Sequence, residues 1–354
     1  MTMIWTVLQF ILFFGLLVFI HELGHMLVAK ALGIEIEEFG FGYPPRLAKL
    51  FTWKGTEFTL NWIPFGGFVR PKGEENPDEP GSILAAPKWK RFLVMVAGAT
   101  MNFIFGIVLL IVMFSVAGGQ DTSKVMVANV DASSPAQVAG LQSGDIITEV
   151  GEYEIDSFDS MTAATNQYKG QEVSVSYDRD GTIGTVLLTP RENPPENQGA
   201  IGIQITYPVI SLPFGQSVVQ AFKTFWQQVK TTVMMPINLI RGAISPNEAR
   251  VVGIKGIFDM FNNASQNDQI SAVGFPIYRL SLISMISIAL GITNLLPIPA
   301  LDGGQIMFLL IEAITGKKIP DKVAIVVNNL FFYALIALMI YITIQDFVNP
   351  IFAP

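Results

Sequence analysis

The chain has 354 residues, of which 51% are hydrophobic and 14% are charged, whereas about 25% of the residues in an ordinary soluble domain are charged. This composition argues against a soluble protein and indicates a membrane protein. The formal net charge of −7 gives no reason to expect a nucleic-acid partner. Because the chain has no cysteine, disulfides and thiolate ligands are excluded, and a metal would have to be held by histidine and carboxylate side chains.

Four stretches of low charge are long enough to cross a bilayer core of about 30 Å. They cover residues 1–20, 92–117, 280–301 and 323–345. A cleaved signal peptide is the alternative for the first stretch, but that stretch lacks a basic beginning and a small-residue cleavage site. The sequence therefore predicts four membrane-spanning helices.

Lysine and arginine cluster between the first and second of these stretches and again at 317–322. The positive-inside rule places both clusters in the cytosol. Both termini and the long segment between the second and third stretches are then predicted to lie outside the cytosol.

The first predicted segment, 1–33, ends its apolar run with His21-Glu22-Leu23-Gly24-His25. Positions i and i+4 of a helix lie on one face, so both imidazoles can reach one metal ion. Glu22 between them is the candidate general base. His21 and His25 are the only histidines of the chain, and ionisable groups inside a membrane segment usually mark function.

Residues 34–91 are predicted to form a β-region and a loop on the cytosolic side. Glycine, aromatic and alternating apolar residues fill 34–70, a pattern typical of short strands joined by turns. At membrane depth an open strand edge is tolerated when it is buried in protein or pairs with a guest strand. Phe65, Gly66 and Gly67 are therefore candidate substrate contacts; a hairpin that only packs on the helices is the alternative.

After the second predicted span, 92–119, residues 120–206 are more polar and contain frequent turns. Alternating apolar residues predict strands at 125–130 and 172–177, with a short helix at 134–139 between them. We expect a small α+β domain inserted between membrane helices.

Residues 207–278 form the next predicted segment. Within it, 214–240 has phenylalanine and valine at helical spacing, which favours an amphipathic helix on the membrane surface, interrupted at Pro236. A re-entrant segment is the alternative. Residues 246–275 are mixed and polar and show no clear pattern.

The third predicted span, 279–320, contains the acid Asp302, and the fourth helix and tail occupy 321–354. A catalytic zinc normally has three protein ligands and one open position. With two histidines and no further histidine or cysteine, the third ligand must be a carboxylate, and Asp302 is the only acid in or directly bounding the apolar stretch 280–301. The alternative for Asp302 is a helix N-cap after the preceding prolines.

Asn294 lies in the same apolar run. Its amide could hydrogen-bond a substrate backbone or a developing oxyanion. The alternative is an interhelical hydrogen bond, or a brace for carbonyl groups freed ahead of the prolines.

Four motifs together resemble the bacterial members of the site-2 protease family, which include the regulator of sigma-E protease, and the resemblance covers nearly the whole chain. They are His21–His25, Phe39–Gly42, Trp89–Asn102 and Asn294–Gly303. The resemblance implies one zinc ion per chain held by His21, His25 and Asp302, with Glu22 as the catalytic acid and base and Asn294 in contact with substrate.

The resemblance also implies the activity and the place. It points to a zinc-dependent intramembrane endopeptidase of the bacterial cytoplasmic membrane that cleaves single-span membrane proteins, such as anti-sigma factors or remnant signal peptides. Residues 120–206 resemble a PDZ domain, carried by 134–147. Such a domain binds peptide ends or acts as a size filter, and we favour the filter. The sigma-E protease carries two PDZ domains, whereas this chain has room for one.

Zinc at such a site would lower the pKa of a bound water to about 7, and Glu22 would take its proton as the water attacks a peptide carbonyl. Glu22 then returns the proton to the leaving amine. Two other classes of function stay open: a non-catalytic membrane scaffold with a vestigial motif, and a metal transporter that uses the His/Asp cluster as a transit site.

Overall fold

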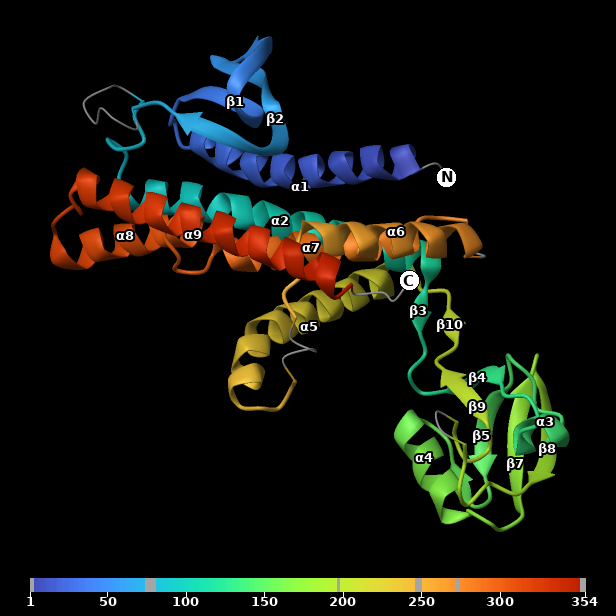
Figure 1. Ribbon diagram of the computed structural model, residues 1–354. Helices are drawn as coiled ribbons and strands as arrows, with labels where there is room; N and C mark the ends of the chain where they lie inside the picture. Colours follow the sequence, from blue (N-terminus) through green and yellow to red (C-terminus); the bar gives the residue numbers. More distant parts are fainter. Residues whose placement is uncertain (1–2, 74–80, 196–197, 246–249, 272–273, 351–354) are drawn as a thin grey trace. The chain divides into compact units, whose positions relative to one another are not determined.

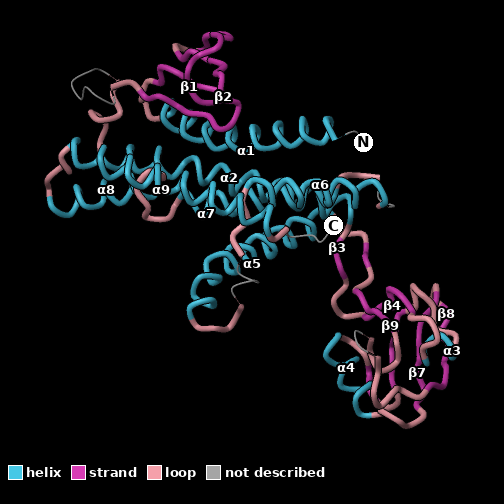
Figure 2. The backbone as a smooth tube through the Cα atoms, in the orientation of Figure 1, coloured by secondary structure: helices cyan, strands magenta, loops and turns pink. Residues whose placement is uncertain are grey.

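The computed structural model describes residues 3–73, 81–195, 198–245, 250–271 and 274–350 (Figures 1 and 2). The chain divides into two compact units. Unit 1 comprises 1–113 and 218–354, and unit 2 comprises 114–217.

Unit 1 contains four helices that are long and apolar enough to cross a membrane. These are α1 (Met3–Ala31), α2 (Lys88–Ala117), α7 (Ile277–Asn294) and α9 (Asp321–Val348). Each overlaps one of the four stretches predicted from low charge, which confirms the expectation of four apolar helices, although the third stretch runs past the end of α7 at Asn294.

The predicted third span, 279–320, contains two helices rather than one. Helix α7 ends at Asn294, and α8 (Asp302–Thr315) begins after a short loop. The loop contains Pro297 and Pro299, which have no backbone N–H to continue a helix. Because of this break, Asp302 stands at the start of a helix rather than within one.

Small residues bring α1 and α2 together. A Cβ atom on Gly24 would lie 2.5 Å from the carbonyl oxygen of Ala97, so only glycine permits this approach. Helices α2 and α7 are joined by two buried hydrogen bonds, from Ser284 Oγ to the carbonyl of Gly106 at 2.9 Å and from Ser287 Oγ to the carbonyl of Asn102 at 2.8 Å.

The β-region is a hairpin of two long antiparallel strands, β1 (Ile36–Trp53) and β2 (Thr56–Pro71), with several register shifts. Sequence predicted short strands here. Met26 of α1 and Phe39 and Phe58 of the hairpin share one hydrophobic cluster, which fixes the hairpin to the first helix.

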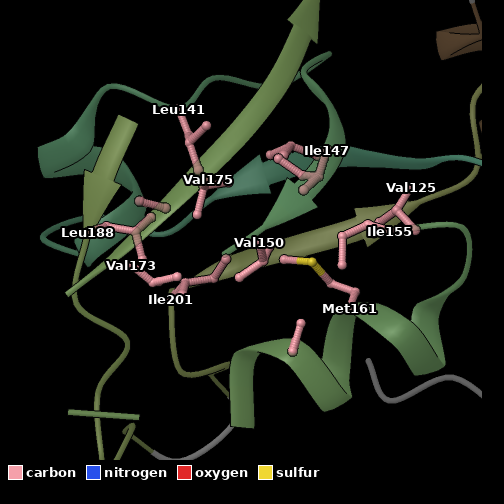
Figure 3. Close-up of a cluster of buried hydrophobic side chains, with 13 residues drawn as sticks. Val125, Leu141, Ile147, Val150, Ile155, Met161, Val173, Val175, Leu188 and Ile201 are labelled. Carbon is pink, nitrogen blue, oxygen red and sulfur yellow. The ribbon is translucent and has the colours of Figure 1, made fainter. Parts of the chain in front are cut away.

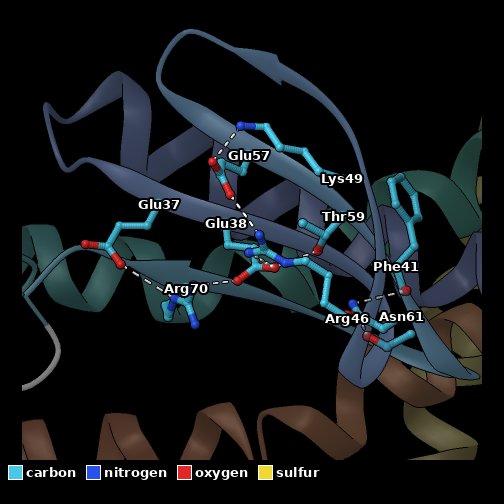
Figure 4. Close-up of polar contacts among 10 residues, drawn as sticks. Glu37, Glu38, Phe41, Arg46, Lys49, Glu57, Thr59, Asn61 and Arg70 are labelled. Carbon is cyan, nitrogen blue, oxygen red and sulfur yellow. Dashed lines mark hydrogen bonds and ion pairs between the residues drawn. The ribbon is translucent and has the colours of Figure 1, made fainter.

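A buried carboxylate organises the polar side of the hairpin (Figure 4). Glu38 is only 4% exposed. Its carboxylate accepts hydrogen bonds from Arg46 and Thr59, each at 2.7 Å, and from Arg70. A buried charge is tolerated when it is paired and hydrogen-bonded, so these contacts tie the two strands together.

Helix α6 (Ile254–Ile270) occupies the region in which the sequence showed no pattern. Phe261 packs with Phe10 and Phe13 of α1 and with Leu282 of α7. Helix α5 (Phe214–Ile240) has the predicted bounds, but it continues through Pro236 without the expected break.

Unit 2 is an α+β domain. Its six-stranded sheet has the order β8-β7-β5-β4-β9, with β6 paired to β5, and β3 and β10 form a separate pair. The strands are β3 (Gly119–Gln120), β4 (Val125–Val130), β5 (Ile146–Val150), β6 (Tyr153–Glu154), β7 (Val173–Arg179), β8 (Thr182–Leu188), β9 (Ile203–Thr206) and β10 (Val209–Ile210). The helices are α3 (Pro135–Ala139) and α4 (Phe158–Gln167).

Alternation along the strands supplies the core of unit 2 (Figure 3). Val125, Ile147 and Val175 are fully buried, and Met161 of α4 closes the same cluster. Successive side chains of a strand point to opposite faces, so every second residue enters the core.

Candidate metal centre

The structure brings the three predicted ligands together. Helix α1 presents His21 and His25 one turn apart, and Asp302 arrives from the first position of α8. Asp302 Oδ2 lies 3.1 Å from His21 Nε2 and 3.4 Å from His25 Nε2, and the two Nε2 atoms are 3.2 Å apart. The three atoms form a nearly equilateral triangle.

This triangle fits a tetrahedral zinc site. With ligand bonds of about 2.0–2.1 Å, tetrahedral geometry requires ligand atoms about 3.3 Å apart. Asp302 Oδ2 is buried and has no hydrogen-bond partner in the described part of the chain. A buried carboxylate oxygen aimed at two imidazole nitrogens is satisfied by a cation.

The hydrogen-bond partner of Nδ1 in each imidazole determines whether Nε2 has the lone pair that binds a metal. His25 Nδ1 lies 2.7 Å from the carbonyl oxygen of Val94, which only accepts hydrogen bonds. Nδ1 of His25 therefore has the proton, and Nε2 is free to bind metal. A half-turn of the Asn102 amide gives His21 the same arrangement, because Asn102 Nδ2 is 3.2 Å from His21 Nδ1 and Asn102 Oδ1 is buried with no partner among the described residues.

Gly98 on α2 leaves room for the two imidazoles. A Cβ atom at this position would lie 2.3 Å from His25 Nε2 and 2.7 Å from His21 Nε2. Sequence reasoning gave Gly98 and Asn102 no role of their own. The available signal was a glycine and a polar amide four residues apart, one helical turn, within an apolar span.

The N-cap alternative for Asp302 does not describe this structure. The N-cap position of α8 is Leu301, and no side-chain cap hydrogen bond is present there. The Asp302 carboxylate is directed instead at the two histidines.

Glu22 lies where two cavities of different polarity meet. A mainly apolar groove of about 350 Å³ runs between α1 and the hairpin and includes Glu22, Gly66 and Gly67. A more polar cavity of about 530 Å³ includes Glu22, His25 and Asp302. Glu22 thus faces both the candidate metal site and the groove.

The four residues predicted to contact substrate lie in different surroundings. Gly66 and Gly67 line the groove, and a Cβ on Gly67 would lie 3.5 Å from Glu22 Cγ. Phe65 belongs to β2, but its side chain lies outside the described residues. Asn294 is half-buried at the end of α7, makes no side-chain hydrogen bond within the described chain, and lines neither cavity. Its role stays a prediction.

The sequence is similar to known proteins over nearly its whole length. The family model Peptidase family M50 matches residues 9–338. A Clostridium acetobutylicum protein named as a zinc metalloprotease is 33% identical over 349 residues, covering 96% of this chain and 97% of its own length. Zinc metalloprotease RasP of Shouchella clausii is 30% identical over 427 residues, covering 96% and 98%.

Among solved structures, the PDZ domain of an SdrC-like protein from Listeria monocytogenes covers 24% of this chain and 88% of its own, with 22% identity and a TM-score of 0.22. That likeness is too weak to carry an argument about unit 2. The family match and the similarity to the clostridial protein extend over nearly the entire sequence. The chain therefore belongs to peptidase family M50, the site-2 protease family, and is a metalloprotease.

Proposed function

We propose that this metalloprotease cleaves membrane proteins within or near the bilayer, with zinc held by His21, His25 and Asp302 and with Glu22 as general base. Zinc is the cofactor expected of this family. The observation that carries the proposal is the triangle of ligand atoms, 3.1–3.4 Å on each side, at the end of an apolar helix.

Bound zinc would acidify a water molecule and polarise the scissile carbonyl. Glu22 would accept the proton of the attacking water and deliver it to the leaving amine. Val94 and Asn102 would keep both imidazoles oriented with Nε2 toward the site. Gly98 would keep the site open on the α2 side.

The groove between α1 and the hairpin suits an extended peptide. A helical substrate hides its amide groups, so the scissile segment must unwind before water reaches its carbonyl. Gly66 and Gly67 bring the hairpin backbone beside Glu22. A substrate in extended conformation could pair with this backbone as an added strand. We propose single-span membrane proteins as substrates, either anti-sigma factors or remnant signal peptides, with Asn294 as a further contact.

We also propose that unit 2 is a PDZ domain that acts as a size filter or binds peptide ends. A groove of about 300 Å³ runs along α4 and β9 and supports this assignment. The distribution of lysine and arginine supports a bacterial cytoplasmic membrane protein with unit 2 outside and the metal site toward the cytosol.

The test is substrate capture with Glu22→Gln, followed by mass spectrometry of the bound proteins. We expect cleavage to fall by about 10²–10⁴-fold while zinc content stays at one ion per chain, because the base is lost and the ligands remain. Glu37→Gln, a change at an exposed hairpin position, is the matched control and should cleave normally. Normal turnover by Glu22→Gln, or capture of soluble proteins alone, would contradict the proposal.

A further inference from the structure

Asp302 is positioned by the loop that precedes it. Gly303 and Gly304 pack so closely on this loop that a Cβ on Gly303 would lie 2.1 Å from the carbonyl oxygen of Leu296, and one on Gly304 would lie 2.4 Å from that of Ile298. The start of α8 is therefore packed directly against the loop. The conformation of the loop determines where the Asp302 carboxylate lies.

One residue of this loop has an unusual backbone. Ala300 has a backbone φ angle of +76°, which residues other than glycine rarely adopt. Such a conformation persists only where its surroundings hold it in place. The backbone N–H of Ala300 donates to Asn328 Oδ1 of α9 at 3.2 Å.

Asn328 connects this loop to the site. It lines the same cavity as Glu22, His25 and Asp302. Its Oδ1 accepts from Ala300, and its Nδ2 donates to no protein acceptor within the described residues.

The other end of α9 is anchored. Asp346 is fully buried and accepts hydrogen bonds from the backbone N–H groups of Gly253 and Gly256, each at 2.9 Å, and from Arg250 at 2.8 Å. These contacts join α9 to the beginning of α6. By contrast, no residue in the apolar 18-residue window of α9 is buried within the structure.

We infer that Asn328 is a positioning residue for the third metal ligand. By holding the N–H of Ala300, it keeps the loop in the conformation that directs Asp302 at the two histidines, and α9 thereby contributes to metal affinity without supplying a ligand. The inference rests on the metal site of the proposed function.

The test is zinc affinity, measured on the purified full-length protein by competition with a chromophoric chelator. Asn328→Leu keeps the size of the side chain, suits a membrane helix, and removes the acceptor. We expect zinc affinity to fall about 10-fold, and the visible spectrum of the cobalt-substituted protein to change, because Asp302 is less well placed. The melting temperature of the metal-free protein should stay close to that of the wild type.

Three further variants sharpen the result. Asn329→Leu is the matched control, since Asn329 is exposed one residue away, and it should bind zinc normally. Asn328→Asp keeps an acceptor oxygen and should bind zinc at least as tightly as the wild type. Asn328→Ala removes the same acceptor and tests the inference again if leucine disturbs folding.

Two experimental outcomes distinguish a failure of this inference from a failure of the proposed metal site. If Asp302→Ala loses zinc while Asn328→Leu and Asn328→Ala bind it normally, the positioning role is overturned and the metal site stands. If Asp302→Ala also binds zinc normally, the proposed metal site itself is overturned.

Discussion

The two units differ in the side chains that they bury and expose. In unit 2 the fully buried residues include Val125, Ile147 and Val175, as in a water-soluble domain. In unit 1 the apolar helices bury polar side chains such as Asn102 and Ser287 beside aliphatic ones such as Ile288, whereas aliphatic residues of α9 are exposed. Lipid is as apolar as leucine, so helices gain little by hiding leucine from it. Small and polar residues therefore contribute to the packing of these apolar helices together with the buried apolar side chains.

The largest of these effects on the metal site should come from Gly98→Ala. Its new Cβ would clash with His25 Nε2, so the imidazole must move and zinc affinity should fall by about 100-fold. Chelator competition measures this loss. Gly215→Ala is the matched control, because a Cβ there meets no atom within 4 Å. Normal zinc binding by Gly98→Ala would show that α2 does not bound the site.

An effect on folding rather than on metal affinity is expected in unit 2 from Ile147→Ala, which removes a fully buried aliphatic side chain. The free energy of unfolding of this unit should fall by about 2–5 kcal/mol. Denaturant-dependent proteolysis of residues 114–217 within the full chain measures it. Ile183→Ala, at a position 77% exposed, should change stability by less than about 0.5 kcal/mol. Zinc content should be unchanged in both variants, and loss of zinc from Ile147→Ala would break the contrast between the units.

The smallest effect should come from Ser287→Ala, which deletes the hydrogen bond to the carbonyl of Asn102. Hydrogen bonds between membrane helices contribute about 0.6 kcal/mol on average, so the shift in unfolding should be near that value. Unfolding in mixed micelles measures it, with Ser281→Ala as the control. A loss of several kcal/mol would mean that this contact dominates the packing of α2 on α7.

Sequence reasoning singled out the three candidate ligands, which the structure brings together, because such residues are scarce in this chain. Two histidines at i and i+4 and one acid beside the third apolar stretch are visible without knowledge of packing. The bounds of α5 and of the strand at Val125–Val130 were also predicted correctly, because the spacing of apolar residues can be read without knowledge of packing.

Other features depend on which elements meet, which periodicity does not report. The roles of Gly98 and Asn102 arise from the crossing of α1 and α2. Helix α6 was missed because polar residues such as Asn262, Asn263 and Gln266 dilute its apolar face, which packs on α1 and α7. Asn328 has no distinguishing signal in the sequence, because its contact with the loop before Asp302 forms only in the folded chain.

The position of Glu22 between two cavities has a consequence for the order of events during turnover. A peptide lying in the apolar groove would occupy one side of this carboxylate, while the polar cavity on the other side stays connected to the histidines. Hydrolysis consumes one water molecule for each bond cleaved. A peptide in the groove would leave the polar cavity, which His25 and Asp302 line, free to hold that water molecule.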